Sequence, residues 1–518
     1  MTGKPPTLSG PEDPDVAGLA GQRHGRSMLR KSLWLLVALT ACSDDKSETP
    51  TPDNGSPTGP PGAPMTTTPP AVNPGASTPG APSQPQGPGM PPPTQPPATP
   101  SGDAGARDSG MAATDAGPSG QPGANTCVGT MKLDLYVSDP KLCVYVYAQN
   151  VNRARGIAFA PNGDLFVSAG EIVVLWDANK NGTSEASERS TFATAPGLNH
   201  GIAFSRDNKW LYASSPSTVY RWAYGEGQRE EGGSPQTVVS GIPGGGHVTR
   251  TLAFDSQGRL IVTIGSASNV DTQQNDLMNR SLIRRFTLPE SLPTGGIPHT
   301  MGEKIATGMR NEAGIWVDPD DRIWGVENGR DDLRDQDLGG DIHNDNPGEE
   351  LNLVDGKEPT FYGYPNCFTE FRIEGGMGKG QGAQWADQTL SQSMQMTDAV
   401  CSDPAMVRPP VYSMPAHWAP LGIIRYTGHS LPMNGDFIIP AHGSWNRQPA
   451  AGRVVARARM QGDTVMMLEP IVGEKDSAGQ LRQGMWDARP VDVRQGPDEA
   501  VYVSDDAGDR ILKIGYAP

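Results

Sequence analysis

Arginine and histidine residues recur where short apolar segments of this chain begin, and this spacing suggests a shared binding site. The set comprises Arg155, His247, Arg250, Arg310, Asn311, His442, Trp445, Arg447 and Arg489. Guanidinium groups on one face repel one another unless an anion lies among them, and their forked donors match carboxylates. We therefore expect a polycarboxylate or phosphate ligand, with Trp445 as a stacking surface for a flat molecule. For each arginine taken alone, a surface salt bridge is the alternative.

His247 is the member of this set best suited to acid–base chemistry. It lies in GGGHVTRTLAF (244–254), where three glycines allow the backbone to approach a ligand. A neutral imidazole has an ordinary pKa of about 6.5, which suits removal of a hydroxyl proton. The alternative is a structural histidine bonded to a neighbouring repeat. His200 lacks the glycine-rich approach and ranks lower, and His299, His417 and His429 are expected to be structural.

One segment has the spacing of a calcium-binding loop. Asp177, Asn179, Asn181, Thr183 and Glu188 fit the pattern D-x-[DN]-x-[DN]-G-x5-E, in which oxygen ligands alternate along a sharply turned loop. The flanking helices of an EF-hand are missing, so the alternatives are a calcium-stiffened loop and a plain polar turn. A second acidic segment, 327–352, suits a metal site, a sugar site or a solvated loop.

The elements that position these residues repeat along the chain. Each repeat has a short apolar strand, a turn of the type Pro/Asp-x-Gly, a second alternating strand and then a third. Six copies occur, at 156–170, 201–215, 251–265, 314–328, 422–441 and 491–506. Repeats of this size with several strands each are typical of a β-propeller. We therefore predict an all-β, six-bladed propeller with its site on the face where the repeats begin, and an array of β-sandwiches is the alternative.

The composition of the first 126 residues predicts an export signal followed by a linker. Arg30 and Lys31 precede the apolar run 33–41, and Leu39-Thr40-Ala41-Cys42 resembles a bacterial lipobox. Residues 43–126 are rich in Pro, Gly, Ser and Thr and contain too few large apolar side chains to form a core. We predict a signal region over 1–42 with acylation at Cys42, a disordered linker over 43–126, and the propeller over 127–518. The chain would then be an exported lipoprotein of the outer membrane (periplasmic face) or the cell surface.

Charge and cysteine content agree with an exported protein that does not bind nucleic acid. The chain has 42 Lys and Arg against 58 Asp and Glu, a formal charge of −16. Four cysteines remain besides Cys42, and an even number in an oxidising compartment indicates disulfides. Proximity favours pairing Cys127 with Cys143 and Cys367 with Cys401, although three connectivities are possible. No CxxC pair is present, so zinc binding is not expected from these residues.

With these residues in place, the folded part resembles the PQQ-dependent sugar dehydrogenases of the glucose/sorbosone dehydrogenase superfamily. It is most similar to their fungal-type pyranose dehydrogenase, or L-sorbosone dehydrogenase-like, branch. The resemblance covers nearly all of 150–518. Its phrases are GGHVTRTLAFDSQGRL, GMRNEAGIWVDPDDRIWGVENGRDDL, LGGDIHNDNPGEELN, FYGYPNCF, AHWAPLGI and HGSWNR.

The resemblance implies pyrroloquinoline quinone (PQQ) over the channel, with its three carboxylates held by arginines and its quinone oxygen polarised by calcium. His247 matches the catalytic base, Arg310 and Asn311 match an Arg-Asn pair that contacts the cofactor, and Arg489 matches a cofactor arginine. Backbone carbonyls of Gly329 and Arg330 match calcium ligands, with Gly-Arg here in place of Gly-Pro. His442 or Arg447 would replace the family's cofactor lysine, and Arg155 and Arg250 are further expected cofactor contacts.

The implied reaction is the oxidation of a pyranose at C1. His247 would take the hydroxyl proton, hydride would pass to the quinone, and Arg310 with calcium would stabilise the developing charge. A separate electron acceptor is expected, because the chain has no CxxCH haem motif. Two other functions fit the same residues: a metal-dependent lactonase and a non-catalytic ligand-binding propeller. Neither of these needs a set of arginines that grips a polyanion.

Overall fold

The computed structural model describes residues 124–272, 279–390 and 396–518. Strands dominate this part of the chain. Its helical segments are the short turns η1 (His299–Met301), η2 (Gln336–Leu338) and α2 (Asp398–Cys401). None of its helices combines the length and the apolarity that crossing a bilayer requires. Cys42, the signal region and nearly all of the predicted linker lie outside the described residues.

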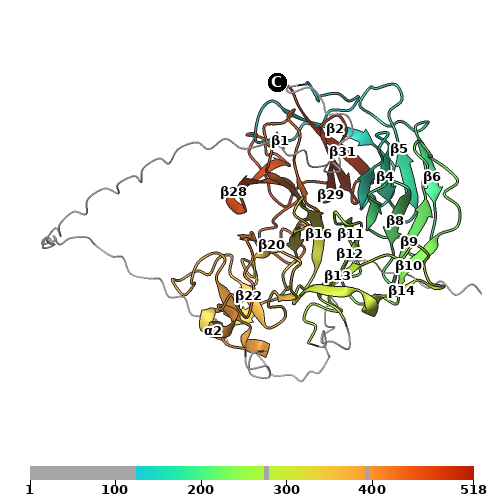
Figure 1. The fold of residues 1–518 in the computed structure, drawn as a ribbon. Helices are drawn as coiled ribbons and strands as arrows, with labels where there is room; N and C mark the ends of the chain where they lie inside the picture. Colours follow the sequence, from blue (N-terminus) through green and yellow to red (C-terminus); the bar gives the residue numbers. More distant parts are fainter. Residues whose placement is uncertain (1–123, 273–278, 391–395) are drawn as a thin grey trace, which may run out of the picture. The chain divides into compact units, whose positions relative to one another are not determined.

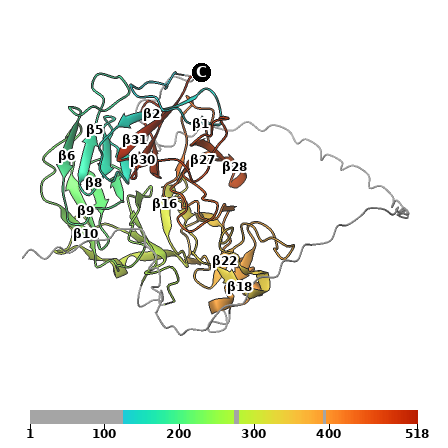
Figure 2. The ribbon, with the colours of Figure 1, turned by 180° about the vertical axis from the view of Figure 1, so that it is seen from behind.

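Six sheets form the blades of a β-propeller, and the prediction of a six-bladed, all-β fold is confirmed. Figures 1 and 2 show the blades following one another around the ring in sequence order, from teal to dark red. Each predicted repeat supplies the first two strands of one blade. From its first strand to its last, blade one contains β3 (Ile157–Phe159), β4 (Leu165–Ser168), β5 (Ile172–Leu175) and β6 (Arg189–Ala193), and blade two contains β7 (Ile202–Phe204), β8 (Trp210–Ser214), β9 (Thr218–Ala223), β10 (Gln236–Ser240) and β14 (Ile297–Pro298). Blade three contains β11 (Leu252–Phe254), β12 (Leu260–Ile264), β13 (Leu282–Phe286), β15 (Glu303–Thr307) and β21 (Thr360–Phe361), and blade four contains β16 (Glu312–Val317), β17 (Ile323–Glu327), β20 (Glu349–Val354) and β24 (Tyr412–Met414). Blade five contains β25 (Ile424–Arg425), β26 (Phe437–Ala441), β27 (Val454–Gln461), β28 (Thr464–Gly473) and β1 (Tyr136–Val137), and blade six contains β29 (Pro490–Gln495), β30 (Val501–Asp505), β31 (Arg510–Tyr516) and β2 (Leu142–Ala148). The strands of the blades are antiparallel except for β14 and β21, which pair in parallel at the outer edges of two blades.

The ring is closed by the two ends of the folded region. Strand β2 from the start of the propeller pairs with β31 from its end, and both belong to blade six. Thr126 donates its N–H to the carbonyl of Tyr516 at 3.0 Å, so this last residue of the predicted linker already contacts the fold. Along the inside, each first strand contacts the next in a cycle of β3, β7, β11, β16, β25, β29 and back to β3.

Apolar side chains fill the spaces between adjacent blades. Tyr212 of β8 meets Phe254 of β11 edge to face, with ring centroids 4.9 Å apart, and Phe166 of β4 meets Phe204 of β7 at 5.1 Å. Such contacts arise because strand residues alternate between the two faces of a blade, and both faces are buried. The blades therefore form a rigid base for the loops at the ends of their strands.

Serine hydroxyl groups form hydrogen bonds between neighbouring blades at two of the candidate site residues. The Ser214 hydroxyl at the end of β8 donates to the Arg250 carbonyl at 2.9 Å, and the Ser504 hydroxyl in β30 donates to the Arg155 carbonyl at 2.5 Å. Both acceptors directly precede the first strand of the next blade. These bonds fix the backbone from which the channel-facing side chains project.

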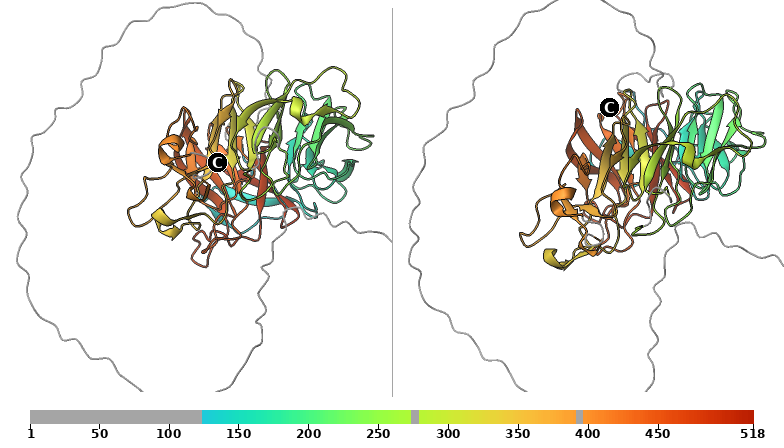
Figure 3. Two further views of the ribbon diagram at one scale, coloured as in Figure 1. Left: turned by 90° about the horizontal axis from the view of Figure 1, so that it is seen from below. Right: turned by 60° about the horizontal axis from the view of Figure 1, so that its bottom comes forward.

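Residues 330–410 carry an insertion that projects from blade four. Two ribbons, β18 (Arg334–Asp335) with β19 (Gly340–Asp341) and β22 (Cys367–Thr369) with β23 (Gln384–Ala386), form it together with η2 and α2. In Figure 3 its yellow and orange segments extend away from the teal and green blades.

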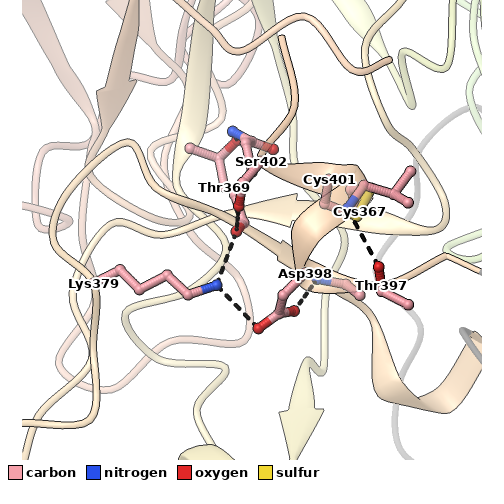
Figure 4. Close-up of a disulfide and its surroundings, with 10 residues drawn as sticks. Cys367, Thr369, Lys379, Thr397, Asp398, Cys401 and Ser402 are labelled. Carbon is pink, nitrogen blue, oxygen red and sulfur yellow. Dashed lines mark hydrogen bonds and ion pairs between the residues drawn. A yellow bond between two sulfur atoms is a disulfide. The ribbon is translucent and has the colours of Figure 1, made fainter. Parts of the chain in front are cut away.

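Two disulfides are present, Cys127–Cys143 and Cys367–Cys401, and these are the pairs that proximity favoured. The second joins β22 to α2 inside the insertion (Figure 4). Beside it, Lys379 Nζ pairs with Asp398 Oδ2 at 3.0 Å, and Asp398 Oδ1 accepts the Ala386 N–H. The disulfide and the Lys379–Asp398 pair therefore hold the same short helix against the ribbon.

Candidate functional site

The predicted site residues lie at one end of the first two strands of their blades. Arg155, Arg310 and Arg489 immediately precede first strands, and His442 immediately follows β26, a second strand. In an antiparallel pair the start of one strand lies beside the end of the other, so these positions share one rim of the channel. On this rim the side chains form two hydrogen-bonded clusters.

The first, which we call the Arg310 cluster, comprises Arg310, Asn269, Asp331, His417 and His247. Arg310 is buried, and its guanidinium donates to Asp331 Oδ2 at 3.0 Å. It also donates to the Asn269 carbonyl at 3.1 Å, to Asn269 Oδ1 at 3.0 Å and to the carbonyls of Asn328 and Gly329 at 3.2 and 2.7 Å. His417 Nδ1 lies 3.6 Å from Asp331 Oδ1. Asp331 therefore lies between Arg310 and His417.

The pKa shifts of this cluster favour the charged forms of Asp331 and His417. Burial acts to raise the pKa of Asp331, but the hydrogen bond with His417 and the charge of Arg310 outweigh it and lower the pKa overall. Burial acts to lower the pKa of His417, and Asp331 and Glu349 outweigh that effect, so its pKa is raised. Both shifts favour an ion pair between Asp331 and His417.

His247 is held neutral at the edge of the same cluster. Its burial, and then the nearby charge of Arg310, lower its pKa to about 3. Its Nδ1 lies 2.7 Å from the Ser266 hydroxyl. A Cβ added to Gly265 would meet His247 Cβ at 2.6 Å and Asn311 Oδ1 at 3.0 Å, so Gly265 lies tightly between these two site residues. The structure thus brings His247, Arg310 and Asn311 together.

The second group, the Arg489 cluster, comprises Arg155, His442, Arg489 and Asp506. Asp506 accepts from Arg155 Nη1 at 2.5 Å and from His442 Nε2 at 2.9 Å. Arg489 donates to the backbone carbonyls of His442 at 3.2 Å and Gly443 at 3.0 Å. Asp506 therefore pairs with the Arg155 guanidinium and the His442 ring, and Arg489 is held beside them by two backbone carbonyls.

The charges of the Arg489 cluster leave its imidazole neutral. Burial lowers the pKa of His442, and the hydrogen bond with Asp506 only partly offsets that effect. Burial would raise the pKa of Asp506, but His442 and then Arg155 and Arg489 outweigh it and lower the pKa. The two arginines and the imidazole therefore favour the charged form of the Asp506 carboxylate.

One loop, residues 442–447, connects the two clusters. At one end His442 belongs to the Arg489 cluster, and at the other the Asn446 carbonyl accepts from His343 Nε2 at 3.2 Å. The His343 carbonyl in turn accepts from His417 Nε2 at 2.5 Å, in the Arg310 cluster. Between these ends Trp445 is 64% exposed. A large aromatic side chain is thus presented to solvent on a loop anchored to both clusters.

Arg250 is a correction to the sequence analysis, because its side chain is fully buried rather than available to a ligand. Its guanidinium donates to four backbone carbonyls, those of Pro216, Pro243, His247 and Thr249, at 2.7 to 3.0 Å. Burial lowers its pKa to about 10. Arg250 therefore holds the backbone of the His247 loop in place.

Arg447 is a second correction. Its guanidinium donates to the Asn344 carbonyl at 2.6 Å, the Pro449 carbonyl at 2.7 Å and Asp345 Oδ1 at 2.8 Å. These bonds tie the loop 442–447 to the insertion after β19. The side chain that was considered as a replacement for a cofactor lysine thus supports the loop, and His442 is the member of that pair that lies in a cluster.

The predicted calcium carbonyls at Gly329 and Arg330 have other surroundings. The Gly329 carbonyl accepts from Arg310 Nη1 at 2.7 Å, and the Gly329 N–H donates to Glu349 Oε2 at 2.7 Å. The Arg330 side chain pairs with buried Asp387. A permanent cation of the chain thus already contacts the carbonyl that was predicted to bind calcium, and the donor set in this arrangement does not fit a second cation there.

The loop 177–188 uses its side-chain oxygens internally. Asp177 accepts the N–H groups of Asn181 and Gly182, and Glu188 accepts those of Ala178 and Glu185. The Thr183 hydroxyl faces Thr130, and Asn179 and Asn181 accept the N–H groups of Asn181 and Thr183 respectively. Across the three described ranges, no three His, Cys, Asp or Glu side chains converge as metal ligands. The polar-turn alternative describes this loop.

Sequence reasoning missed Asp331, His417 and Asp506 as members of the site. Asp331 lies in the acidic segment that was left undecided, His417 was expected to be structural, and Asp506 closes the sixth repeat. One signal was available for Asp506, which ends the sixth repeat on the same rim as Arg489. His417 is brought in by the turn after β24, which the repeat pattern does not reveal.

Comparisons with known proteins agree with this architecture. The sequence model of the family described as TrAA12-like matches residues 137–516. A pyrroloquinoline quinone-dependent sugar dehydrogenase of Hypocrea jecorina (strain QM6a) is 33% identical over 290 residues, which are 52% of this chain and 65% of the relative. A pyrroloquinoline quinone-dependent pyranose dehydrogenase of Coprinopsis cinerea is 31% identical over 312 residues, which are 58% of this chain and 41% of the relative. Both alignments span less than two thirds of the relative's length.

Solved structures of similar fold cover the propeller. A calcium structure of the Trichoderma reesei carbohydrate-active enzyme family AA12 superposes with a TM-score of 0.65 at 27% identity, over 76% of this chain and 99% of that chain. The holo form of the pyranose dehydrogenase PQQ domain of Coprinopsis cinerea gives a TM-score of 0.64 at 25% identity, over 74% of this chain and 97% of that chain. Both comparisons therefore span almost the whole of the solved domain.

Proposed function

This chain belongs to the TrAA12-like family, and from that membership we propose that it is a dehydrogenase that oxidises a sugar with PQQ as its cofactor. The relatives named as PQQ-dependent sugar and pyranose dehydrogenases support the cofactor and the substrate class. The holo PQQ domain of similar fold supports the propeller as the part that binds the cofactor.

The observation that carries the proposal is the gathering of three guanidinium groups on one rim. Arg155 pairs with Asp506 and Arg310 pairs with Asp331, while Arg489 donates to the backbone carbonyls of His442 and Gly443. A tricarboxylate fits such a rim, because arginine forks bind carboxylates through two parallel hydrogen bonds. Trp445 offers a flat surface for a planar ring system.

When bound, PQQ would accept the hydride that leaves the sugar, and with it the two electrons of the C–H bond. His247 acts as the general base, and its Nε2 takes the hydroxyl proton as the C–H bond breaks. Arg310 places positive charge beside the base and favours the anion that develops on the acceptor side. Asn269 and Asp331 hold that guanidinium in position, so it need not reorganise during the reaction.

We further propose that the oxidised carbon is C1 of a pyranose and that the product is a lactone. An anomeric hydroxyl loses its proton to the imidazole, and the C1 hydrogen leaves as hydride, which turns the hemiacetal into an ester. We also propose a separate electron acceptor, which would take up the two electrons of each turnover.

Calcium is the part of the prediction that the donor set does not fit, and no step is assigned to it. Arg310 contacts the Gly329 carbonyl, and the 177–188 loop satisfies its own oxygens. The calcium structure of the Trichoderma reesei protein keeps a calcium requirement testable for this chain.

Reconstitution of the purified apoprotein tests the function. PQQ is titrated in calcium buffer and in EDTA, with binding followed by quenching of tryptophan fluorescence, and aldoses are then screened with an artificial dye as acceptor. We expect tight uptake of PQQ and dye reduction with at least one aldose. The absence of PQQ uptake in either buffer would overturn the proposal, and lactone hydrolysis without PQQ would favour the lactonase alternative.

We also propose that Cys42 is acylated and anchors the protein to the outer membrane or the cell surface through a tether that reaches to about residue 126. Mass spectrometry of the N-terminal peptide of the membrane-extracted protein tests the modification. Release of a Cys42→Ala variant into the soluble fraction is the expected result. An unmodified Cys42 in the mature protein would exclude the anchor.

A further inference from the structure

Ser266 connects the two halves of the Arg310 cluster. It follows β12 and is only 1% exposed. Its N–H donates to the Arg310 carbonyl at 2.8 Å, and its own carbonyl accepts the His247 N–H at 3.1 Å. Its hydroxyl oxygen lies 2.7 Å from His247 Nδ1 and 2.8 Å from the Ser268 carbonyl. Backbone and side chain of this residue are therefore both bonded to site residues.

The direction of the two hydroxyl bonds follows from the chemistry of the partners. A serine hydroxyl has a single hydrogen, and a carbonyl oxygen can only accept. The hydrogen must therefore point to the Ser268 carbonyl, because otherwise two oxygen lone pairs would face each other at 2.8 Å. The Ser266 oxygen then accepts from His247, so Nδ1 carries the imidazole hydrogen.

In a neutral imidazole with hydrogen on Nδ1, the other nitrogen has a lone pair. Of the residues that the structure describes, none donates a hydrogen bond to His247 Nε2. Arg250 fixes the backbone of the same residue through the His247 carbonyl at 2.7 Å. We propose that Ser266 is a positioning residue that selects the Nδ1–H tautomer of His247 and so keeps Nε2 as the proton-accepting atom.

The catalytic consequence of this assignment rests on the proposed function. When Nε2 accepts the sugar proton, the ring becomes an imidazolium that donates from Nδ1 to a neutral hydroxyl. A neutral acceptor stabilises the cation less than a carboxylate would. Burial and then the charge of Arg310 lower the pKa of His247 to about 3, and the more distant charge of Asp331 offsets this only in part. Ser266 thus sets which nitrogen reacts and keeps the base weak.

Two variants and one control test this role. Ser266→Ala removes the acceptor, and Ser266→Asp replaces it with a charged one. Ser430→Ala is the matched control, because Ser430 is also buried and its hydroxyl donates to the Glu499 side chain at 2.7 Å. It lies in the turn between β25 and β26, at the other end of those strands from the rim. Thermal unfolding of all three establishes that they fold.

The first measurement is the nitrogen-15 spectrum of the His247 imidazole in the apoprotein, assigned with His247→Gln. We expect hydrogen on Nδ1 in the wild type and in Ser430→Ala, and a mixture of tautomers in Ser266→Ala. Hydrogen on Nε2 in the wild type would overturn the proposal. This measurement needs no cofactor, so it separates failure of the tautomer assignment from failure of the proposed function.

The second measurement is turnover of the PQQ-loaded enzyme against pH. Ser266→Ala should lower kcat about 10- to 100-fold with unchanged affinity for PQQ, the usual size of effect for residues that orient a functional histidine. Ser266→Asp should move the acidic limb of the kcat profile to higher pH. Wild-type kcat and an unmoved profile in both variants would overturn the positioning role. Sugar oxidation absent from a wild type that has the Nδ1–H tautomer would instead overturn the proposed function.

Discussion

His247 and His442 lie on the same rim of the channel, yet their Nε2 atoms have different surroundings. His442 Nε2 donates to Asp506 at 2.9 Å, and the ring is fixed by that bond. His247 makes its side-chain hydrogen bond through Nδ1 to Ser266, and no described residue donates to its Nε2. Position on the rim therefore does not distinguish the two histidines. His247 is the candidate base because its Nε2 is available to a substrate, whereas the Nε2 of His442 is already bonded to Asp506.

The Arg489 cluster and the Arg310 cluster also differ in the acidic residue that accepts the backbone N–H of the arginine. The backbone N–H of Arg489 donates to Asp505, and Asp505 forms an ion pair with Arg510 at 2.7 Å. The backbone N–H of Arg310 donates to Glu327 at 2.5 Å, and Glu327 has two carboxyl neighbours, Glu350 and Glu312. Burial and then Glu350 raise the pKa of Glu327, and Arg310 offsets that shift only in part. The Arg489 cluster thus rests on a carboxylate in an ion pair, and the Arg310 cluster on acids whose pKa values are raised.

The largest expected effect comes from removing the available nitrogen. His247→Ala should lower kcat by about 10² to 10⁴, the range typical of a lost general base. PQQ affinity should stay close to that of the wild type, since the arginines hold the carboxylates. Stopped-flow reduction of the loaded enzyme and a fluorescence titration of the apoenzyme measure the two quantities separately.

His442→Ala is the partner experiment on the other side. It should weaken PQQ binding by about tenfold or less, as expected for one hydrogen bond, and leave the rate at saturation close to wild type. If the two variants exchanged these effects, His442 would be the base, and the distinction between the two imidazoles would be wrong.

The next largest effect is expected at Arg489. Arg489→Gln keeps a polar side chain but removes the charge, so PQQ affinity should fall about 10- to 100-fold, as for a lost hydrogen bond to a charged group. Added salt should weaken PQQ binding less in the variant than in the wild type. Isothermal titration at two ionic strengths measures both. Arg457→Gln is the control, because Arg457 pairs with Asp436 away from the rim. An unchanged affinity in Arg489→Gln would remove this arginine from the binding site.

The fold could be predicted because each repeat is local in sequence. Alternation and turn residues define a hairpin within about 15 residues, and the six copies became the first two strands of the six blades. The outer strands were less evident. Strand β21 follows the β16–β17 hairpin of blade four in the sequence, yet it pairs with β15 of blade three. Strand β1 lies at the start of the folded region, yet it pairs with β28 of blade five. Such long-range pairings leave no local pattern.

The site could be predicted in outline and not in its bonding. The phasing of arginines with the repeats pointed to Arg155, Arg310 and Arg489, which all lie in the two clusters. The same phasing pointed to Arg250, whose donors are all used by backbone carbonyls. A sequence shows that a guanidinium is present, but only the fold shows whether its hydrogens are already paired. His417 was missed for the opposite reason, since its raised pKa depends on Asp331, 86 positions earlier in the numbering.

The smallest expected effect is on the free energy of unfolding and comes from Glu312, one of the buried acids near Arg310. Glu312 is buried beside Asn352, which donates to its Oε2 at 3.3 Å, and its Oε1 has no partner. Burial raises the pKa of Glu312 well above its ordinary value. The Asn352 hydrogen bond opposes that shift, and Glu350 adds to it. Glu312 therefore keeps a proton in the folded state over a pH range in which the unfolded chain has lost it.

The proton of Glu312 makes the free energy of unfolding depend on pH. Below the ordinary glutamate pKa both states hold the proton, and Glu312 has no effect on the slope. Above it the unfolded state releases the proton first, so the free energy of unfolding falls as the pH rises toward the folded pKa. Glu312→Gln removes this term and should gain about 1 to 2 kcal/mol at pH 8, with little change at pH 4. Urea unfolding at both pH values measures the difference. Asp505→Asn is the contrast, since it breaks a buried ion pair and should lose stability at neutral pH. A Glu312→Gln variant that loses stability at pH 8 would show that the carboxyl is charged in the folded state and that the two sides of the rim rest on equivalent acids.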